Sequence, residues 1–125
     1  MILVDTSIWI DHLRTADPTL VSLLDHNGVL THPTVIGELA LGSLARRATV
    51  LTLLGSLPIA VRASDDEVLA FVDAYRLHSS GLSLVDAHLL ASAFLTPDAR
   101  LWTRDKRLVA VAGKLGIDFT PAELG

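Results

Sequence analysis

The chain begins with the stretch Met1-Ile2-Leu3-Val4-Asp5-Thr6-Ser7-Ile8-Trp9, in which an uninterrupted apolar run ends at a carboxylate. Residues 2–4 predict a short strand that is buried on both faces, as in a parallel sheet. A helix is expected directly after it, from Thr6 to Arg14, with its apolar residues on one side. Asp5 is therefore predicted to lie at the carboxyl end of a buried strand, where open α/β sheets place their ligands.

The rest of the chain repeats this alternation of short apolar runs and helical patterns. Asn27-Gly28, Gly55 and Gly116 are expected to end the helices that precede them. Strands alternating with helices imply parallel crossovers, so the sequence predicts one three-layer α/β/α domain with a mostly parallel sheet of four to five strands. The other expected strands are 29–31, 57–61, 100–103 and 117–119, and the other expected helices are 18–26, 33–44, 45–54, 64–78, 83–95 and 106–115.

Composition limits the classes of protein that fit. The chain has 125 residues, which suits a single domain, and half of them are hydrophobic. No segment approaches the ~20 uninterrupted apolar residues of a membrane span, and the N-terminus lacks the basic region of a signal peptide, so a cytoplasmic protein without a membrane anchor is expected. The apolar surplus suggests a dimer interface or a tightly bound partner. The absence of cysteine excludes disulfides and zinc–thiolate sites.

Four acids stand beside apolar segments: Asp5, Glu38, Asp86 and Asp105. If they converge, their mutual repulsion calls for divalent metal ions. Simpler roles remain open for three of them. Asp5 is suited to cap the helix that follows, Asp86 to complete a capping box with Ser83, and Asp105 to lie in a solvated loop. Glu38 is the hardest to explain away, because it interrupts an apolar helical stretch.

Oxygen ligands of this kind suit the hydrolysis of a phosphodiester. Two divalent ions ~3.5–4 Å apart can serve both the attacking water and the leaving oxygen, and Mg²⁺ and Mn²⁺ prefer carboxylates. The hydroxyls of Thr6, Ser7 and Thr103 are candidates to orient a water or a phosphate, although a helix cap is the favoured role for Thr6.

Three bases surround the last acid: Arg104, Lys106 and Arg107. If a helix begins here, these bases crowd its positive end, where the helix dipole disfavours them. A phosphate backbone would explain them, and we therefore expect RNA contacts at these positions. The net charge of −4 counts mildly against a nucleic-acid binder, although metal ions bound to clustered acids would invert the local charge.

The acid-bearing segments resemble the PIN-domain family, and in particular the VapC toxins of bacterial toxin–antitoxin pairs. The resemblance implies a PIN-like α/β/α domain over residues 1–125 and a Mg²⁺- or Mn²⁺-dependent endoribonuclease. It places the family's four acids on Asp5, Glu38, Asp86 and Asp105, and its hydroxyls on Thr6 or Ser7 and on Thr103. The segments that carry the resemblance are residues 2–11, 35–42, 81–88 and 101–108.

The resemblance also implies partners. It predicts a homodimer and a cognate VapB antitoxin that lays a helix along an apolar groove and inhibits the enzyme. Candidates to line this groove are Ile8, Trp9, Leu13, Leu51 and Leu54, for most of which burial in the core is the favoured role.

Other classes of function fit less well. A Ser-His-Asp hydrolase would need a Gly-x-Ser-x-Gly turn, and a nucleotide-binding fold would need a glycine-rich motif; neither is present. A phosphatase with an aspartyl nucleophile usually carries a second Asp two residues later, where this chain has Ser7. The remaining alternative is a catalytically silent PIN-like module that binds RNA or protein, and metal-dependent cleavage discriminates the two. The five histidines show no metal-ligand spacing and are expected at the surface or as caps.

Overall fold

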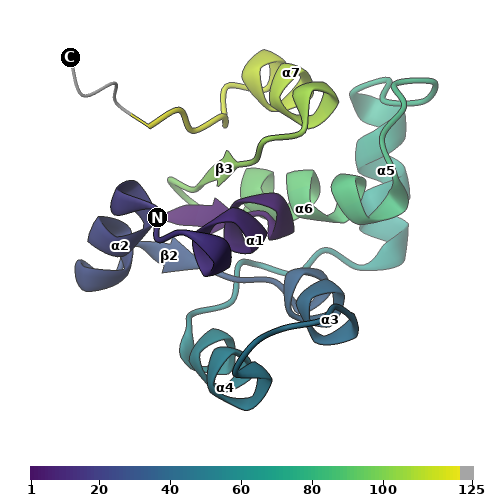
Figure 1. Cartoon of the computed structure of the whole chain (residues 1–125). Helices are drawn as coiled ribbons and strands as arrows, with labels where there is room; N and C mark the ends of the chain where they lie inside the picture. The colour runs from purple at the N-terminus through teal and green to yellow at the C-terminus, as the bar shows by residue number, and fades with distance from the viewer. Residues whose placement is uncertain (122–125) are drawn as a thin grey trace.

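The centre of the fold is a parallel sheet of three strands, β1 (Ile2–Val4), β2 (Val29–Leu30) and β3 (Arg100–Trp102), in the order β2-β1-β3. The structure is a computed structural model and describes residues 1–121. Because β1 is the central strand, its carboxyl end at Asp5 lies between the ends of its two neighbours. The sheet confirms the predicted α/β class, and Figure 1 shows helices on both sides of it.

Two further segments extend the sheet at its edges. Thr31 pairs with Ile59, and Leu101 pairs with Asp118, each through an isolated parallel bridge. The predicted strands 57–61 and 117–119 are therefore present only as single-bridge edges. Pro58 explains the first case, because it has no N–H group to donate to a ladder, although its carbonyl accepts from the N–H of Thr31 (2.8 Å).

Seven helices surround the sheet within the described residues, and several end elsewhere than predicted. The third ends at Leu41 instead of 44, with Gly42 as its C-cap, and the fourth begins after Arg46, which adopts a left-handed φ of 53°. Gly55 lies inside the fourth helix, so its prediction as a helix end is wrong. The helices are α1 (Thr6–Arg14), α2 (Pro18–Asp25), α3 (Pro33–Leu41), α4 (Arg47–Ser56), α5 (Asp65–Ala74), α6 (Leu84–Leu95) and α7 (Lys106–Lys114).

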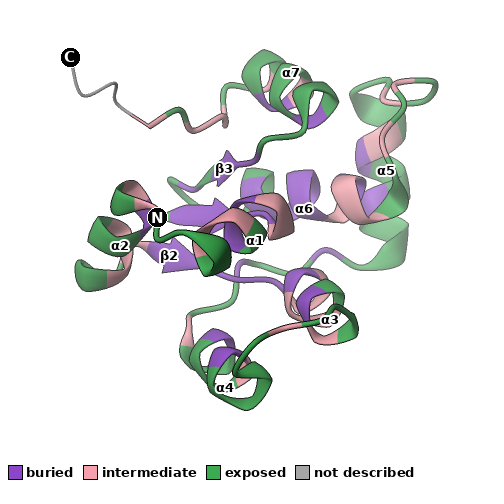
Figure 2. Cartoon of the chain, viewed as in Figure 1, coloured by how far each residue is buried: buried purple, intermediate pink, exposed green. Residues whose placement is uncertain are grey.

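The core lies between the sheet and its covering helices. Figure 2 shows the strands and the middle of α6 buried, whereas α4 and α7 expose their outer sides. In α1, Ile8 and Trp9 are fully buried, as is Leu54 in α4, so these three belong to the core as the favoured interpretation had it. Each of these side chains stabilises the fold by ~1.5–3 kcal/mol relative to its exposed state.

No helix within residues 1–121 has the length and apolar character needed to cross a bilayer. The last four residues of the predicted domain, 122–125, lie outside the described residues.

Candidate active site

Asp5 lies at the centre of the site, directly after β1. The residue is only 8 % exposed, and its Oδ2 atom accepts two hydrogen bonds, from the Ser7 hydroxyl (2.8 Å) and from the Thr103 hydroxyl (2.7 Å). Although Asp5 occupies the N-cap position of α1, its side chain makes no capping hydrogen bond. The helix-cap role that the sequence left open for this carboxylate is therefore not the one it fulfils.

The two hydroxyls that hold Asp5 are themselves held by the segment after β3. The Arg104 N–H donates to the Ser7 hydroxyl oxygen (3.2 Å), and the Asp105 N–H donates to the Thr103 hydroxyl oxygen (3.1 Å). Each hydroxyl thus accepts from one backbone N–H and donates to the same carboxylate oxygen. This arrangement ties residues 103–105 to the carboxyl end of β1 and fixes the rotamer of Asp5.

Glu38 enters the site from α3. Its side chain is exposed in the middle of that helix, and its Oε1 atom accepts from the Thr6 hydroxyl (3.0 Å). The favoured interpretation of Thr6 as a helix cap is wrong, because its hydroxyl reaches across to α3 instead. Since Thr6 follows Asp5 in the chain, this bond places the second acid beside the first.

Asp86 lies in the first turn of α6, and Asp105 is the N-cap of α7. Asp86 completes the capping box of α6: its Oδ2 atom accepts from the Ser83 N–H (3.0 Å), and its own N–H donates to the Ser83 hydroxyl (3.1 Å). Asp105 caps α7 by accepting from the N–H groups of Arg107 (2.9 Å) and Leu108 (3.1 Å). The expected cap at Asp86 is confirmed, and Asp105 is a cap rather than part of a solvated loop.

Hydroxyl and backbone contacts link the acids in an open arrangement. Asp5, Glu38 and Asp105 are joined through Thr6 and Thr103, whereas Asp86 has no direct hydrogen bond to the other three. Within residues 1–121, no three acidic or histidine side chains are assembled closely enough to hold a metal ion. Three of the four predicted acids are thus linked through hydroxyls, whereas a ligand shell formed by all four is not found within the described residues.

The loop that leads into α6 is connected to α7 through an arginine. Arg107 donates from Nη1 to the carbonyl of Gly81 (3.3 Å), in the loop that leads into α6. Gly81 has a φ of 82°, and a Cβ there would lie 3.0 Å from both Cδ and Nη1 of Arg107. Glycine is therefore favoured here by its positive φ, and a larger residue would in addition displace the Arg107 side chain.

The oxygens that remain unused suit a hard cation. Within residues 1–121, each of the four carboxylates accepts hydrogen bonds through one oxygen only, and the second oxygen has no hydrogen-bond donor from the protein. None of the four forms an ion pair with a described base. A buried carboxylate such as Asp5 is costly without a positive partner. This oxygen-only donor set fits Mg²⁺ or Mn²⁺.

The three bases near Asp105 have different surroundings. Arg104 forms ion pairs with Asp11 on α1 and with Asp17 at the start of α2, and Arg107 bonds the Gly81 carbonyl. Lys106 is exposed and forms no ion pair within the described residues. Sequence reasoning missed Asp11 and Asp17. The pair Asp17-Pro18 is a recognisable helix start, but nothing local links either acid to a base about ninety residues later.

His32 lies one residue beyond the described bridge at Thr31, where it caps α3 and accepts from the Thr34 N–H (3.1 Å). Burial, together with the charges of His88 and Arg62, lowers the pKa of His32 from 6.5 to about 4. Between these two pKa values the His32 ring is therefore neutral in the folded state and protonated in the unfolded chain. The expected capping role is confirmed, but the ring is buried and not at the surface.

This difference predicts a pH-dependent stability. Below pH 6.5 the unfolded state binds more protons, so the stabilising contribution of the neutral ring falls between pH 6.5 and pH 4, by roughly 3 kcal/mol in total. His32→Asn keeps a capping acceptor and should show a shallower loss over this range. Urea unfolding at pH 7.5 and pH 4.5 measures the difference. Equal losses in both proteins would contradict the assignment to His32.

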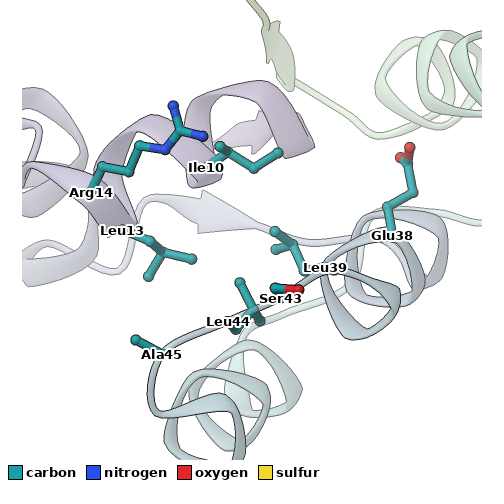
Figure 3. Close-up of a pocket in the computed structure, with 9 residues that line it drawn as sticks. Ile10, Leu13, Arg14, Glu38, Leu39, Ser43, Leu44 and Ala45 are labelled. Carbon is teal, nitrogen blue, oxygen red and sulfur yellow. The ribbon is translucent and has the colours of Figure 1, made fainter.

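A pocket of about 400 Å³ opens beside the site between α1 and the end of α3. Figure 3 shows Ile10 and Leu13 facing Leu39 and Leu44 across it, with Arg14 and Glu38 at opposite rims. Of the predicted groove residues, Leu13 lines the pocket and is 38 % exposed, whereas Leu51 is partly buried against the core. The pocket thus offers an apolar surface next to Glu38 that a protein partner could occupy.

Comparisons with known proteins assign the chain to a family. The PIN domain family matches residues 2–114, a range that contains all four acids. Ribonuclease VapC32 of Mycobacterium tuberculosis, from strain CDC 1551 / Oshkosh and from strain ATCC 25618 / H37Rv, is 53 % identical over 117 residues, which cover 94 % of this chain and 94 % of each relative. The chain therefore belongs to the PIN-domain family and, within it, to the VapC branch.

Proposed function

We propose that this protein is a divalent-metal-dependent endoribonuclease that hydrolyses RNA phosphodiester bonds as the toxin of a type II toxin–antitoxin pair. One observation carries the metal requirement: within residues 1–121, each of the four carboxylates keeps one oxygen without a protein donor, and the buried Asp5 has no positive partner. The similarity to proteins named ribonuclease supports the reaction class.

In this mechanism Asp5, Glu38, Asp86 and Asp105 would hold the Mg²⁺ or Mn²⁺ ions. Bound there, the ions would supply positive charge for an attacking water and for the leaving oxygen. The hydroxyls of Ser7 and Thr103 keep Asp5 in one orientation, and Thr6 does the same for Glu38. Such preorganisation spares the site from reorganising its carboxylates during the reaction.

The test is cleavage of a structured RNA pool by purified protein. We expect cleavage with Mg²⁺ or Mn²⁺, none with excess chelator, and recovery when the metal is restored. Cleavage that persists in chelator would refute the metal requirement. If folded protein binds RNA but leaves it intact under every metal condition, the catalytically silent binding module becomes the better description.

For RNA contact we propose the bases around Asp105: Arg104, Lys106 and Arg107. Lys106 is the most available, so Lys106→Ala should weaken RNA binding and lower the slope of log K against log salt by about 1. Lys114→Ala is the matched control, because Lys114 is an exposed lysine at the opposite end of the same helix. An identical salt dependence in wild type and Lys106→Ala would exclude this contact.

The proposed inhibitor is a VapB-type antitoxin whose apolar segment occupies the pocket of Ile10, Leu13, Leu39 and Leu44. Glu38 at the rim offers a carboxylate to a basic side chain of the partner. Leu13→Asp should weaken the complex at least ~10-fold, because it places a charge on the apolar floor. Val21→Asp, at an equally exposed position (39 %) on α2, should not, and calorimetric titration with the antitoxin distinguishes them.

We also propose a cytoplasmic homodimer. An aromatic pair at the end of α5 and on α6 supports it: the ring centroids of Tyr75 and Phe94 lie 5.2 Å apart, yet these residues remain 42 % and 39 % exposed. Exposed aromatic side chains of this kind are enriched at protein interfaces. Light scattering on the isolated protein measures its mass, and a monomer at micromolar concentration would contradict the dimer.

A further inference from the structure

We propose that Asp11 and Asp17 are positioning residues that set the place of Asp105 through Arg104. The inference rests on the proposed nuclease function, because it assigns to this trio the alignment of the fourth acid with Asp5. Arg104 stands between Thr103, which bonds Asp5, and Asp105 itself. A side chain that anchors Arg104 therefore anchors the segment that joins the two acids.

The ion pairs span three elements. The Nε atom of Arg104 pairs with the Oδ2 atom of Asp11 in α1. Its Nη2 atom lies 3.7 Å from the Oδ2 atom of Asp17, the N-cap of α2. Its backbone N–H donates to the Ser7 hydroxyl (3.2 Å), so side chain and main chain hold the residue against the same region. The loop after β3 is thereby fixed to α1 and α2, the helices that follow the strand bearing Asp5.

Hydrogen bonds hold Asp17 in place independently of Arg104. Its Oδ1 atom accepts from the N–H groups of Thr19 (2.9 Å) and Leu20 (3.1 Å), which leaves Oδ2 for Arg104. Its own N–H donates to Nδ1 of His12 (3.0 Å), which ties the start of α2 back to α1. Because Asp17 is already ordered by these contacts, pairing with Arg104 requires little further ordering of the acid.

The charges around Arg104 distinguish a positioning role from a role in RNA binding. Arg104 faces two acids, so its positive charge is already compensated where it lies. If Arg104 served only as a phosphate contact, removing Asp11 would free its charge and strengthen both RNA binding and cleavage. If the acids position the loop, removing them lowers the turnover number while RNA binding does not weaken. The two roles thus predict changes of opposite sign.

The experiment compares Asp11→Asn, Asp17→Asn and their combination with wild type. Asparagine is an equally good N-cap, so Asp17→Asn keeps the start of α2 while removing the charge. Asp25→Asn is the matched control, since Asp25 is an exposed acid at the end of α2 that forms no ion pair within the described residues. Exposed ion pairs contribute little to stability, so all variants should unfold near the wild-type temperature.

Three readouts decide the outcome. We expect kcat to fall about 10-fold in the double variant, as for partners that orient a metal ligand. RNA affinity measured in chelator should stay equal or rise. Amide exchange at Arg104 and Asp105, whose N–H groups bond the Ser7 and Thr103 hydroxyls, should accelerate in the double variant but not in Asp25→Asn.

Unchanged amide exchange at these two positions overturns the inference, as does an increase of kcat in Asp11→Asn. The exchange readout needs neither RNA nor metal, so it tests the positioning role even if wild type fails to cleave RNA. A wild type without cleavage refutes the proposed nuclease instead. The two failures are therefore distinguishable.

Discussion

Replacing Asp5 by Asn is expected to abolish metal-dependent RNA cleavage, with a loss greater than about 100-fold, because changes in groups that merely orient a metal ligand already cost ~10–100-fold. Asn retains the shape of the side chain, and its carbonyl oxygen can still accept from the hydroxyls of Ser7 and Thr103. The variant should therefore fold as wild type does while lacking the charge. Multiple-turnover cleavage of RNA at saturating Mn²⁺ measures the loss.

Stability should change in the opposite direction. The buried Asp5 carboxylate has no positive partner among the described residues, so in chelator Asp5→Asn should raise the free energy of unfolding by on the order of 1 kcal/mol. Asp25→Asn, which removes an exposed charge, serves as the control in thermal unfolding. An Asp5→Asn protein that is less stable than wild type in chelator would show that the carboxylate has a structural role instead.

Replacing Thr103 by Val is expected to have the second largest effect. Its hydroxyl donates to Asp5 and accepts from the Asp105 N–H, so one substitution removes both bonds between the first and fourth acids. Since Thr103 is only 7 % exposed, the Asp105 N–H and the Asp5 oxygen lose a partner with little access to water. We expect kcat to fall ~10–100-fold and stability to fall by ~1–3 kcal/mol.

Thr103→Ser provides the matched control, because serine retains the hydroxyl and loses only a methyl group. Its kcat should lie close to that of wild type, which would assign the effect of valine to the two hydrogen bonds. Cleavage rates and urea unfolding of the two variants test this. A serine variant as slow as the valine variant would attribute the loss to packing around β3.

The central sheet could be predicted because its strands are short apolar runs that end at polar residues. Residues 2–4 are the clearest case, since the apolar run is too short for a helix and Asp5 ends it at once. The edges could not be predicted with the same certainty. Whether 57–61 forms a full strand or a single bridge depends on Pro58 within the segment and also on how far β2 extends, and the second factor is not a property of the segment alone.

Helix ends were less predictable where tertiary contacts determine them. The sequence predicts a helix end at Gly55, yet α4 continues to Ser56. A Cβ atom at Gly55 would meet no atom within 4 Å apart from its chain neighbours and the backbone of α4 itself. Arg46 takes a left-handed conformation that its sequence does not signal, while the neighbouring Arg47 bonds the Ala40 carbonyl near the end of α3. This contact between the end of α3 and the start of α4 leaves no recognisable pattern in the sequence.

In the candidate site, too, the residues could be predicted but the contacts between them could not. The four acids were recognisable as carboxylates beside apolar segments and through the family resemblance. Their connections were not, because the bonds from Thr6 to Glu38 and from Thr103 to Asp5 join residues 32 and 98 positions apart. The pairing of Arg104 with Asp11 and Asp17 is hidden for the same reason, so the sequence alone left Arg104 as an apparently unpaired base.

The measurement that tests the account most directly is the titration of Mn²⁺ into wild type and Asp5→Asn, followed by electron paramagnetic resonance of the free ion. If the four acids form a metal site centred on Asp5, wild type removes Mn²⁺ from solution and the variant binds it at least about 10-fold more weakly. Equal binding by both proteins, in samples shown to be folded, would contradict the central role of Asp5.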